Sequence, residues 1–122
     1  GSIMARIYVS GHNDEALDAP GTDMREVISG LDPDGDGRIF YLTSLSVANE
    51  HATETAVVEL ADQDEASITA ANQRGAPIHI GPGDTVQVTF GDGEMPFVTN
   101  CVAGVTDGTV ATLSIHGAGY LA

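Results

Sequence analysis

Alternation of apolar and polar residues with a period of two recurs along this chain and constrains its fold more than any other feature. In residues 85–90, Val and Phe alternate with Thr and Gln, and in residues 56–60 Ala, Val and Leu alternate with Val and Glu. Residues 111–115 place Ala, Leu and Ile on one side of a third segment. Successive side chains of a β-strand point to opposite faces of a sheet, so each segment predicts a strand with one buried face.

The longest predicted strand occupies residues 39–47 and is apolar on both faces at its start. We therefore expect Phe40 and Leu42 to lie on a second covered face, and we assign them to an interface that threefold assembly would bury. The two faces that period two predicts are Ile39, Tyr41, Thr43, Leu45 and Val47 on one side, and Phe40, Leu42, Ser44 and Ser46 on the other.

Turn-forming residues separate the predicted strands. The segment "GPGD" at residues 81–84 lies between two strand-like segments and predicts a hairpin. Roughly seven to nine short strands and no long helical pattern are typical of an antiparallel β-sandwich or jelly roll. We therefore predict an all-β, jelly-roll-like single domain whose core is built mainly from Val, Ile, Leu and Ala.

The N-terminal part is predicted to differ from this body. Residues 1–3 precede Met4 and are expected to be the remnant of a cloning tag. Residues 4–23 are predicted to hold a short strand at residues 5–9 and then an arm or loop, because the rest is rich in turn formers and has no apolar period. Residues 24–122 are predicted to form the sandwich.

Acidic residues dominate the charge, since 18 Asp and Glu face only four Arg, which gives a formal net charge of −14. Such a field repels phosphate backbones and anionic lipid, so we expect no nucleic-acid partner and no membrane partner. No apolar run approaches the length that crosses a bilayer, and no signal peptide follows Met4. The acidity suits a saline habitat, a cationic partner or a need for solubility, and the sequence leaves these open.

The segment "DPDGDG" at residues 32–37 matches the first half of an EF-hand calcium loop. Asp32, Asp34 and Asp36 have the ligand spacing, and Gly37 stands where the loop needs a sharp turn. The twelfth position is Thr43, which lacks the carboxylate that completes such a loop. We read the segment as a turn that leads into a strand and expect no cofactor, with Ca²⁺ bound by the three aspartates as the alternative.

No constellation of side chains in the sequence supports catalysis, so we expect that the protein is not an enzyme. The four histidines are scattered without the short spacing of a zinc site. His79 and His116 follow isoleucines that would take the core face, so both are expected to point outward, where they could meet across a sheet or an oligomer axis and respond to pH. Cys101 is expected to be a small, inert core residue.

Two long segments resemble the small β-sandwich virion proteins of tailed bacteriophages, in particular capsid decoration proteins. They are "RIFYLTSLSVANEHATETAVVELAD" and "GDTVQVTFGDGEMPFVTNCVAGVTDGTVATLSIHGAGY", and the similarity spans about residues 38–120. The resemblance implies a homotrimer that binds the major capsid protein on the outer surface of the head, with residues 4–23 as a gripping arm. It also implies synthesis in the host cytoplasm and a final location in the virion.

Two functions remain open at this point. The first is capsid decoration, in which the protein stabilises the head by burying surface between capsid subunits. The second is a calcium-dependent carbohydrate- or ligand-binding sandwich that uses the aspartate loop. Sugar platforms usually use exposed aromatic rings, and this chain has no Trp and only three Tyr, which argues mildly against the second function.

Overall fold

The computed structural model describes residues 6–13, 16–17, 24–26, 37–62, 69–107 and 111–122, and all further statements concern these residues. They contain strands and no helix, and in particular no helix that is long and apolar enough to span a membrane. The strands are β1 (Ile7–Asn13), β2 (Ala16–Leu17), β3 (Met24–Glu26), β4 (Phe40–Asn49), β5 (Ala56–Asp62), β6 (Gln73–Ile80), β7 (Thr85–Thr89), β8 (Pro96–Phe97), β9 (Cys101–Asp107) and β10 (Ala111–Leu121).

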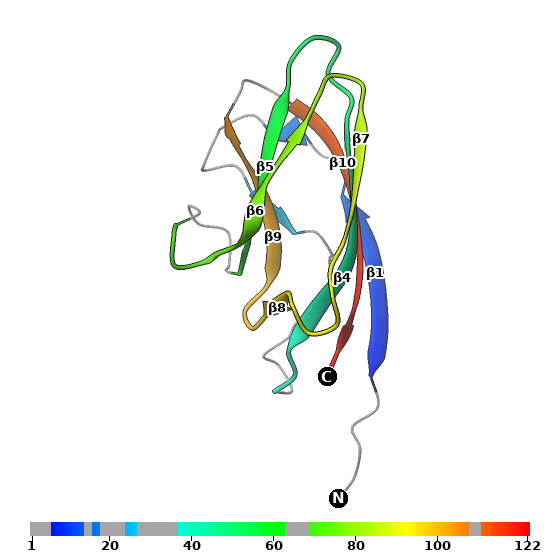
Figure 1. Cartoon of the computed structure of the whole chain (residues 1–122), viewed down its shortest axis with the longest axis vertical. Coiled ribbons are helices and arrows are strands. Elements are labelled where there is room, and N and C mark those ends of the chain that lie inside the picture. Colours follow the sequence, from blue (N-terminus) through cyan, green and yellow to red (C-terminus); the bar gives the residue numbers. More distant parts are fainter. Residues whose placement is uncertain (1–5, 14–15, 18–23, 27–36, 63–68, 108–110) are drawn as a thin grey trace, which may run out of the picture.

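Two antiparallel sheets face each other across one core (Figure 1). The first sheet has the order β1-β10-β4-β7, with β2 paired to β10 and β8 paired to β4. The second sheet has the order β3-β9-β5-β6. Strands that follow one another in the chain often lie in opposite sheets, as β4 and β5 do, and β9 and β10. The prediction of an all-β antiparallel sandwich is confirmed.

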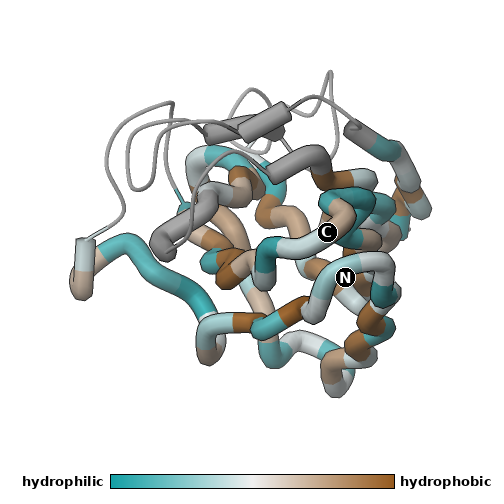
Figure 2. Tube along the Cα trace, turned by 90° about the horizontal axis from the view of Figure 1, so that it is seen from above, coloured by the Kyte–Doolittle hydropathy of each residue, from teal (hydrophilic) through white to brown (hydrophobic). Residues whose placement is uncertain are grey.

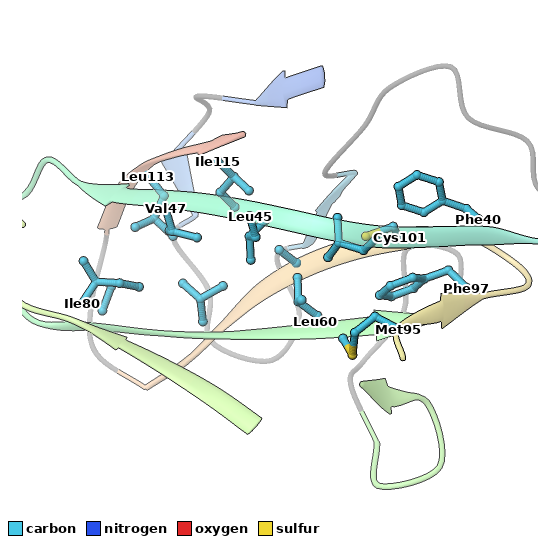
Figure 3. Close-up of a cluster of buried hydrophobic side chains, with 14 residues drawn as sticks. Phe40, Leu45, Val47, Leu60, Ile80, Met95, Phe97, Cys101, Leu113 and Ile115 are labelled. Atoms are coloured by element: carbon cyan, nitrogen blue, oxygen red, sulfur yellow. The ribbon is translucent and has the colours of Figure 1, made fainter. Parts of the chain in front are cut away.

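The core lies between the inner faces of the two sheets. Side chains of Leu45 and Val47 in the first sheet point toward Leu60 and Ile80 in the second (Figure 3). Figure 2 shows how hydrophobic and hydrophilic residues alternate along the tube, as expected of strands with one buried face. The buried core cluster consists of Phe40, Leu42, Leu45, Val47, Ala56, Val58, Leu60, Ile80, Met95, Phe97, Cys101, Ala103, Leu113 and Ile115.

A β-bulge at Thr43 corrects the predicted faces of the longest strand. On β10, Ala118 pairs with Ser44 while the next residue, Gly119, pairs with Leu42, so Thr43 is an extra residue on β4. The Thr43 hydroxyl donates a hydrogen bond of 3.1 Å to the carbonyl of Ala118, which holds the bulge in place. Because one residue is inserted, the inward face changes phase at this point.

Phe40 and Leu42 consequently lie inside the protomer. Their exposed fractions are 0% and 1%, and both belong to the core cluster together with Leu45 and Val47. The prediction that they line an interface between subunits is therefore wrong. In a strand without irregularities, Phe40 and Leu42 would lie on the opposite face from Leu45. The bulge inserts one extra residue between them and so brings all three to the same face.

The segment "GPGD" is a turn, but it does not form the predicted hairpin. β6 pairs with β5 in one sheet and β7 pairs with β4 in the other, so the turn carries the chain between sheets. Asn49 at the end of β4 fixes it, since its N–H bonds to the carbonyl of Asp84 and its carbonyl accepts the N–H of Gly83. Gly83 has a φ of 75°, which glycine adopts without steric cost.

The N-terminal strand is longer than predicted. Residues 10–13, expected to begin a loop, continue β1 and pair with β10 as far as Asn13 opposite Ile115. Residues 16–17 form β2 against the start of β10. Polar composition misled the prediction here, because an edge strand needs few apolar residues when its partner strand supplies the hydrogen bonds. Residues 14–15 and 18–23 of the predicted arm lie outside the described residues.

Candidate interaction surface

All three tyrosines of the chain lie side by side on the outer face of the first sheet. Tyr8 of β1 is opposite Tyr120 of β10, and Tyr120 is opposite Tyr41 of β4. The ring centroids of Tyr8 and Tyr120 are 6.0 Å apart in an edge-to-face arrangement, and those of Tyr41 and Tyr120 are 5.2 Å apart and stacked. These separations are favourable for aromatic pairs. We call the three residues the tyrosine row.

The bulge at Thr43 creates the tyrosine row as well as the core beneath it. Without the extra residue, Tyr41 would share the face of Leu45 and Val47 and would point into the sandwich. With it, Tyr41 points outward beside Tyr120 and next to Pro96, its partner on β8. One irregular residue therefore decides which aromatic side chains are available at the surface.

An ion pair closes one side of the tyrosine row. The Arg6 guanidinium lies over the Tyr120 ring, 4.2 Å from its centroid, and bonds to both carboxylate oxygens of Asp92 at 3.0 and 3.2 Å. The Tyr120 hydroxyl donates a further hydrogen bond to Asp92. Hydrogen bonds from Tyr120 and then Arg6 lower the pKa of Asp92, and the bond to this carboxylate, followed by burial, raises the pKa of Tyr120.

Exposure within the tyrosine row is uneven. Tyr8 is 75% exposed, whereas Tyr120 is only 4% exposed because Tyr8, Tyr41 and Arg6 surround it. Ile7, next to Tyr8, is also exposed. Tyr120 therefore acts as a fixed support that orients the more accessible rings. An exposed aromatic ring held in this way loses little conformational entropy when it binds a partner.

A shallow hollow of about 370 Å³ lies farther along the same outer face. Small side chains of β4 and β10, namely Ser44, Ser46 and Ala118, form its floor, while Gln87 of β7 and His116 of β10 stand at its sides. The floor is low because Ser and Ala project little from the sheet. This outer hollow and the tyrosine row together make the face uneven and accessible.

The two predicted outward histidines are exposed, but they do not meet within the protomer. His116 lies on β10 in the first sheet and His79 lies on β6 in the second. The neighbour of His116 is instead His12 of β1, directly opposite in register, with ring centroids 6.3 Å apart. A pairing of His79 with His116 would need two protomers and stays a prediction.

A second opening lies between the sheets at their β6 and β7 edges. It has a volume of about 350 Å³ and is lined chiefly by apolar side chains, among them Ile78 of β6, Val86 and Val88 of β7, and Phe90. Met95 forms part of its floor. Within the single protomer, Met95 is buried, whereas the other four residues are only partly buried. We call this opening the edge slot.

The three aspartates of the predicted calcium loop, Asp32, Asp34 and Asp36, lie outside the described residues. Gly37, which follows them, is exposed and has a φ of 76°, as a turn glycine does. Within the described ranges, no three His, Cys, Asp or Glu side chains come together as metal ligands. Calcium binding by the loop stays an untested alternative.

Cys101 is fully buried in the core cluster, which confirms that it is a packing residue. Burial, and secondarily the nearby Asp62, raises the pKa of its thiol far above the ordinary value, so the reactive thiolate is scarce. Asp62 has a structural role beside it. Its carboxylate accepts the backbone N–H groups of Val98, Thr99 and Asn100 and pairs with Arg74 at 3.4 Å.

The tyrosine row is the feature that sequence reasoning missed. Tyr8, Tyr41 and Tyr120 are far apart in the chain, and their contact depends on two strand registers and one bulge. The available signal was the position of Tyr8 and Tyr120 in terminal segments with strand-like composition. That signal did not indicate which strands pair.

Comparisons with known proteins add little to this geometry. No protein-family model matches the chain, and no curated protein matches it at a significant level. One similar solved structure is the coat protein of tobacco streak virus, at 8% sequence identity over 93% of this chain and 85% of that chain, with a TM-score of 0.48. A likeness of this size supports no conclusion about function.

Proposed function

We propose that this chain is a structural protein of a virion that binds the outer surface of a capsid and stabilises the head. The capsid as partner comes from the resemblance of residues 38–120 to phage decoration proteins. The observation that supports a binding role is the tyrosine row, whose most accessible member, Tyr8, is 75% exposed on β1, a strand that pairs with β10 without a bulge. Tyrosine is enriched at protein interfaces and often contributes much of their binding energy.

The rest of the molecule suits a part that binds without catalysis. A two-sheet body is held in register over long strands, and its three tyrosine rings contact one another on the outer face of the first sheet. A formal charge of −14 also favours a partner surface with positive charge and disfavours nonspecific binding to nucleic acid. The trimer that the resemblance implies is a further element of the proposal.

Cosedimentation with capsids tests this role. Empty heads of the phage that encodes the chain, stripped of outer proteins, are mixed with wild-type protein and with Tyr8→Ala. Loss of a central interface tyrosine should weaken binding by about thirtyfold or more, since hot-spot truncations cost at least about 2 kcal/mol. Val98→Ala is the matched control, because Val98 is another exposed apolar residue, in the turn after β8.

The outcome separates the proposal from its competitor. Equal binding by all three proteins would exclude the tyrosine row as the interface, and a failure of wild-type protein to bind would exclude the capsid role. A carbohydrate-binding sandwich is the second candidate, favoured by the same exposed ring of Tyr8 beside polar side chains of β1. Glycan binding that a chelator abolishes would support that candidate and involve Asp32, Asp34 and Asp36.

A further inference from the structure

In the described part of the chain, no strand pairs with the outer edge of β7, and β7 itself carries none of the usual protection against strand pairing. β7 is the last strand of its sheet in the described part of the chain and has the sequence TVQVT, with no charge and no proline. The neighbouring edge strand β6 differs, because it contains Arg74, Gly75 with a φ of 75° and Pro77. Proline, charge and irregular backbone are common means of blocking an edge.

Backbone hydrogen bonds show which groups of β7 face the open edge. The carbonyl of Asp84 and the N–H of Phe90 both bond to β4, at Asn49 and Thr43. Backbone groups alternate in direction along a strand, so residues 86 and 88 also face β4. Thr85, Gln87 and Thr89 therefore direct their N–H and C=O groups away from the sheet.

The sequence of β7 reads the same in both directions, and this symmetry matches its free groups. We propose that β7 pairs antiparallel with β7 of a second copy of this chain, around a twofold axis at Gln87. In this register Gln87 lies opposite Gln87, and Thr85 lies opposite Thr89 on each side. All outward groups then fall in hydrogen-bonded pairs, with two bonds in each of the three pairs.

Side chains on both faces of β7 fit the same register. On the outer face, Thr would lie opposite Thr and Gln opposite Gln, and such polar cross-strand pairs stabilise sheets. On the inner face, Val86 would lie opposite Val88 and extend the apolar lining of the edge slot. The outer hollow and the edge slot flank β7 on its two faces, which leaves room for the partner's side chains.

The charge distribution favours this edge over most of the surface. Two copies with a formal charge of −14 each repel, so contact is least costly where charge is absent. The nearest acidic residue in sequence is Asp84, and the twofold register places it opposite Phe90 rather than opposite its own copy. Association is therefore expected to strengthen as salt screens the general repulsion.

Charge exchange at Gln87 tests the twofold register in the full chain. Sedimentation equilibrium of wild-type protein should give twice the protomer mass at high concentration. Gln87→Lys and Gln87→Glu each place like charges opposite one another and should weaken association about two- to fivefold. An equimolar mixture of the two variants should restore association. The introduced Lys and Glu attract each other only if residue 87 of one copy faces residue 87 of the other.

Two further variants keep the result interpretable. Gln87→Pro removes an N–H that faces the open edge and no bond to β4, so it should abolish association while thermal melting stays close to that of wild type. Ser10→Lys on the opposite edge strand β1 is the control and should associate as wild type does. The proposal is overturned by a monomer at all concentrations, by a trimer, by Gln87 variants that associate normally, or by a mixture that fails to recover.

This contact is independent of capsid binding, but it is an alternative to the trimer that the proposed function includes. A twofold contact yields dimers, whereas the resemblance to decoration proteins implies trimers, so the measured mass decides between the two assemblies. Capsid binding is measured separately through Tyr8, which lies on β1 at the other edge of the sheet. Capsid binding and the twofold contact can therefore each fail while the other stands.

Discussion

Replacement of Asn49 by alanine should destabilise the protein severely, because this buried side chain joins three segments. Asn49 is 1% exposed, and its Nδ2 donates to the carbonyls of Glu54 at 2.7 Å and Ile80 at 3.1 Å. Its Oδ1 accepts the N–H of His51 at 3.0 Å. The side chain thus ties the end of β4 to the β4–β5 turn and to the end of β6.

The expected loss of unfolding free energy follows from the polar groups that the alanine variant leaves without hydrogen-bond partners. The Ile80 carbonyl is in buried surroundings, where an unsatisfied group costs about 1–3 kcal/mol. The groups on Glu54 and His51 are partly buried and can recover some hydration, so each lost bond costs about 0.5–1.5 kcal/mol. The sum is about 2–6 kcal/mol, a large part of the roughly 5–15 kcal/mol that stabilises a domain.

Urea unfolding followed by far-ultraviolet circular dichroism measures this loss. The urea midpoint should fall without a change in slope, and the melting temperature should fall by roughly 8–24 °C. Asn49→Asp is the matched comparison, since it keeps the acceptor for His51 but turns a carboxylate toward two carbonyls. The loss of unfolding free energy in Asn49→Asp, relative to wild type, should grow as pH rises and the carboxylate ionises. A loss below about 1 kcal/mol for alanine would refute the inference that Asn49 joins these segments.

Three further predictions concern the bulge region and the core. Gly119→Ala should destabilise by about 2 kcal/mol or more in urea unfolding, because its Cβ would lie 2.1 Å from the Tyr41 carbonyl oxygen; a neutral effect would mean that β10 moves away easily. Cys101 should react with a thiol reagent only as fast as the protein unfolds, since burial raises its pKa; rapid labelling of the folded protein would contradict this. In an absorbance titration, part of the tyrosine signal should appear at higher pH because the pKa of Tyr120 is raised, and Asp92→Asn should reduce this delay without removing the part that burial causes. The raised pKa of Tyr120 stabilises the folded protein below the ordinary tyrosine pKa, and this stabilisation is lost as pH rises through the raised value. The lowered pKa of Asp92 stabilises the folded protein above the ordinary aspartate pKa, and this stabilisation is lost as pH falls through the lowered value.

The faces of β7 show what a local pattern can predict. Val86 and Val88 point inward and Thr85, Gln87 and Thr89 outward, as the alternation in this segment indicates. Side-chain direction in a regular strand depends only on position along it, so the sequence is sufficient where the strand has no irregularity. The all-β class follows from several such segments and the turns between them.

β4 shows where the same reasoning fails. One extra residue at Thr43 reverses the faces of Phe40, Tyr41 and Leu42, and its cause is the pairing with Ala118 and Gly119, far along the chain. The hairpin predicted at residues 81–84 failed for a related reason. A local turn signal does not reveal that β6 and β7 find their partners in different sheets.

By itself, the sequence determined the strand character, the acidic charge and the palindromic order of residues in β7, because each depends on composition or on neighbouring residues. Only the tertiary structure decided which side chains share a surface. The tyrosine row exists because three strands align Tyr8, Tyr120 and Tyr41, and because the bulge turns Tyr41 outward. Register between distant strands is set by the burial of the whole core, and no short segment of sequence contains that information.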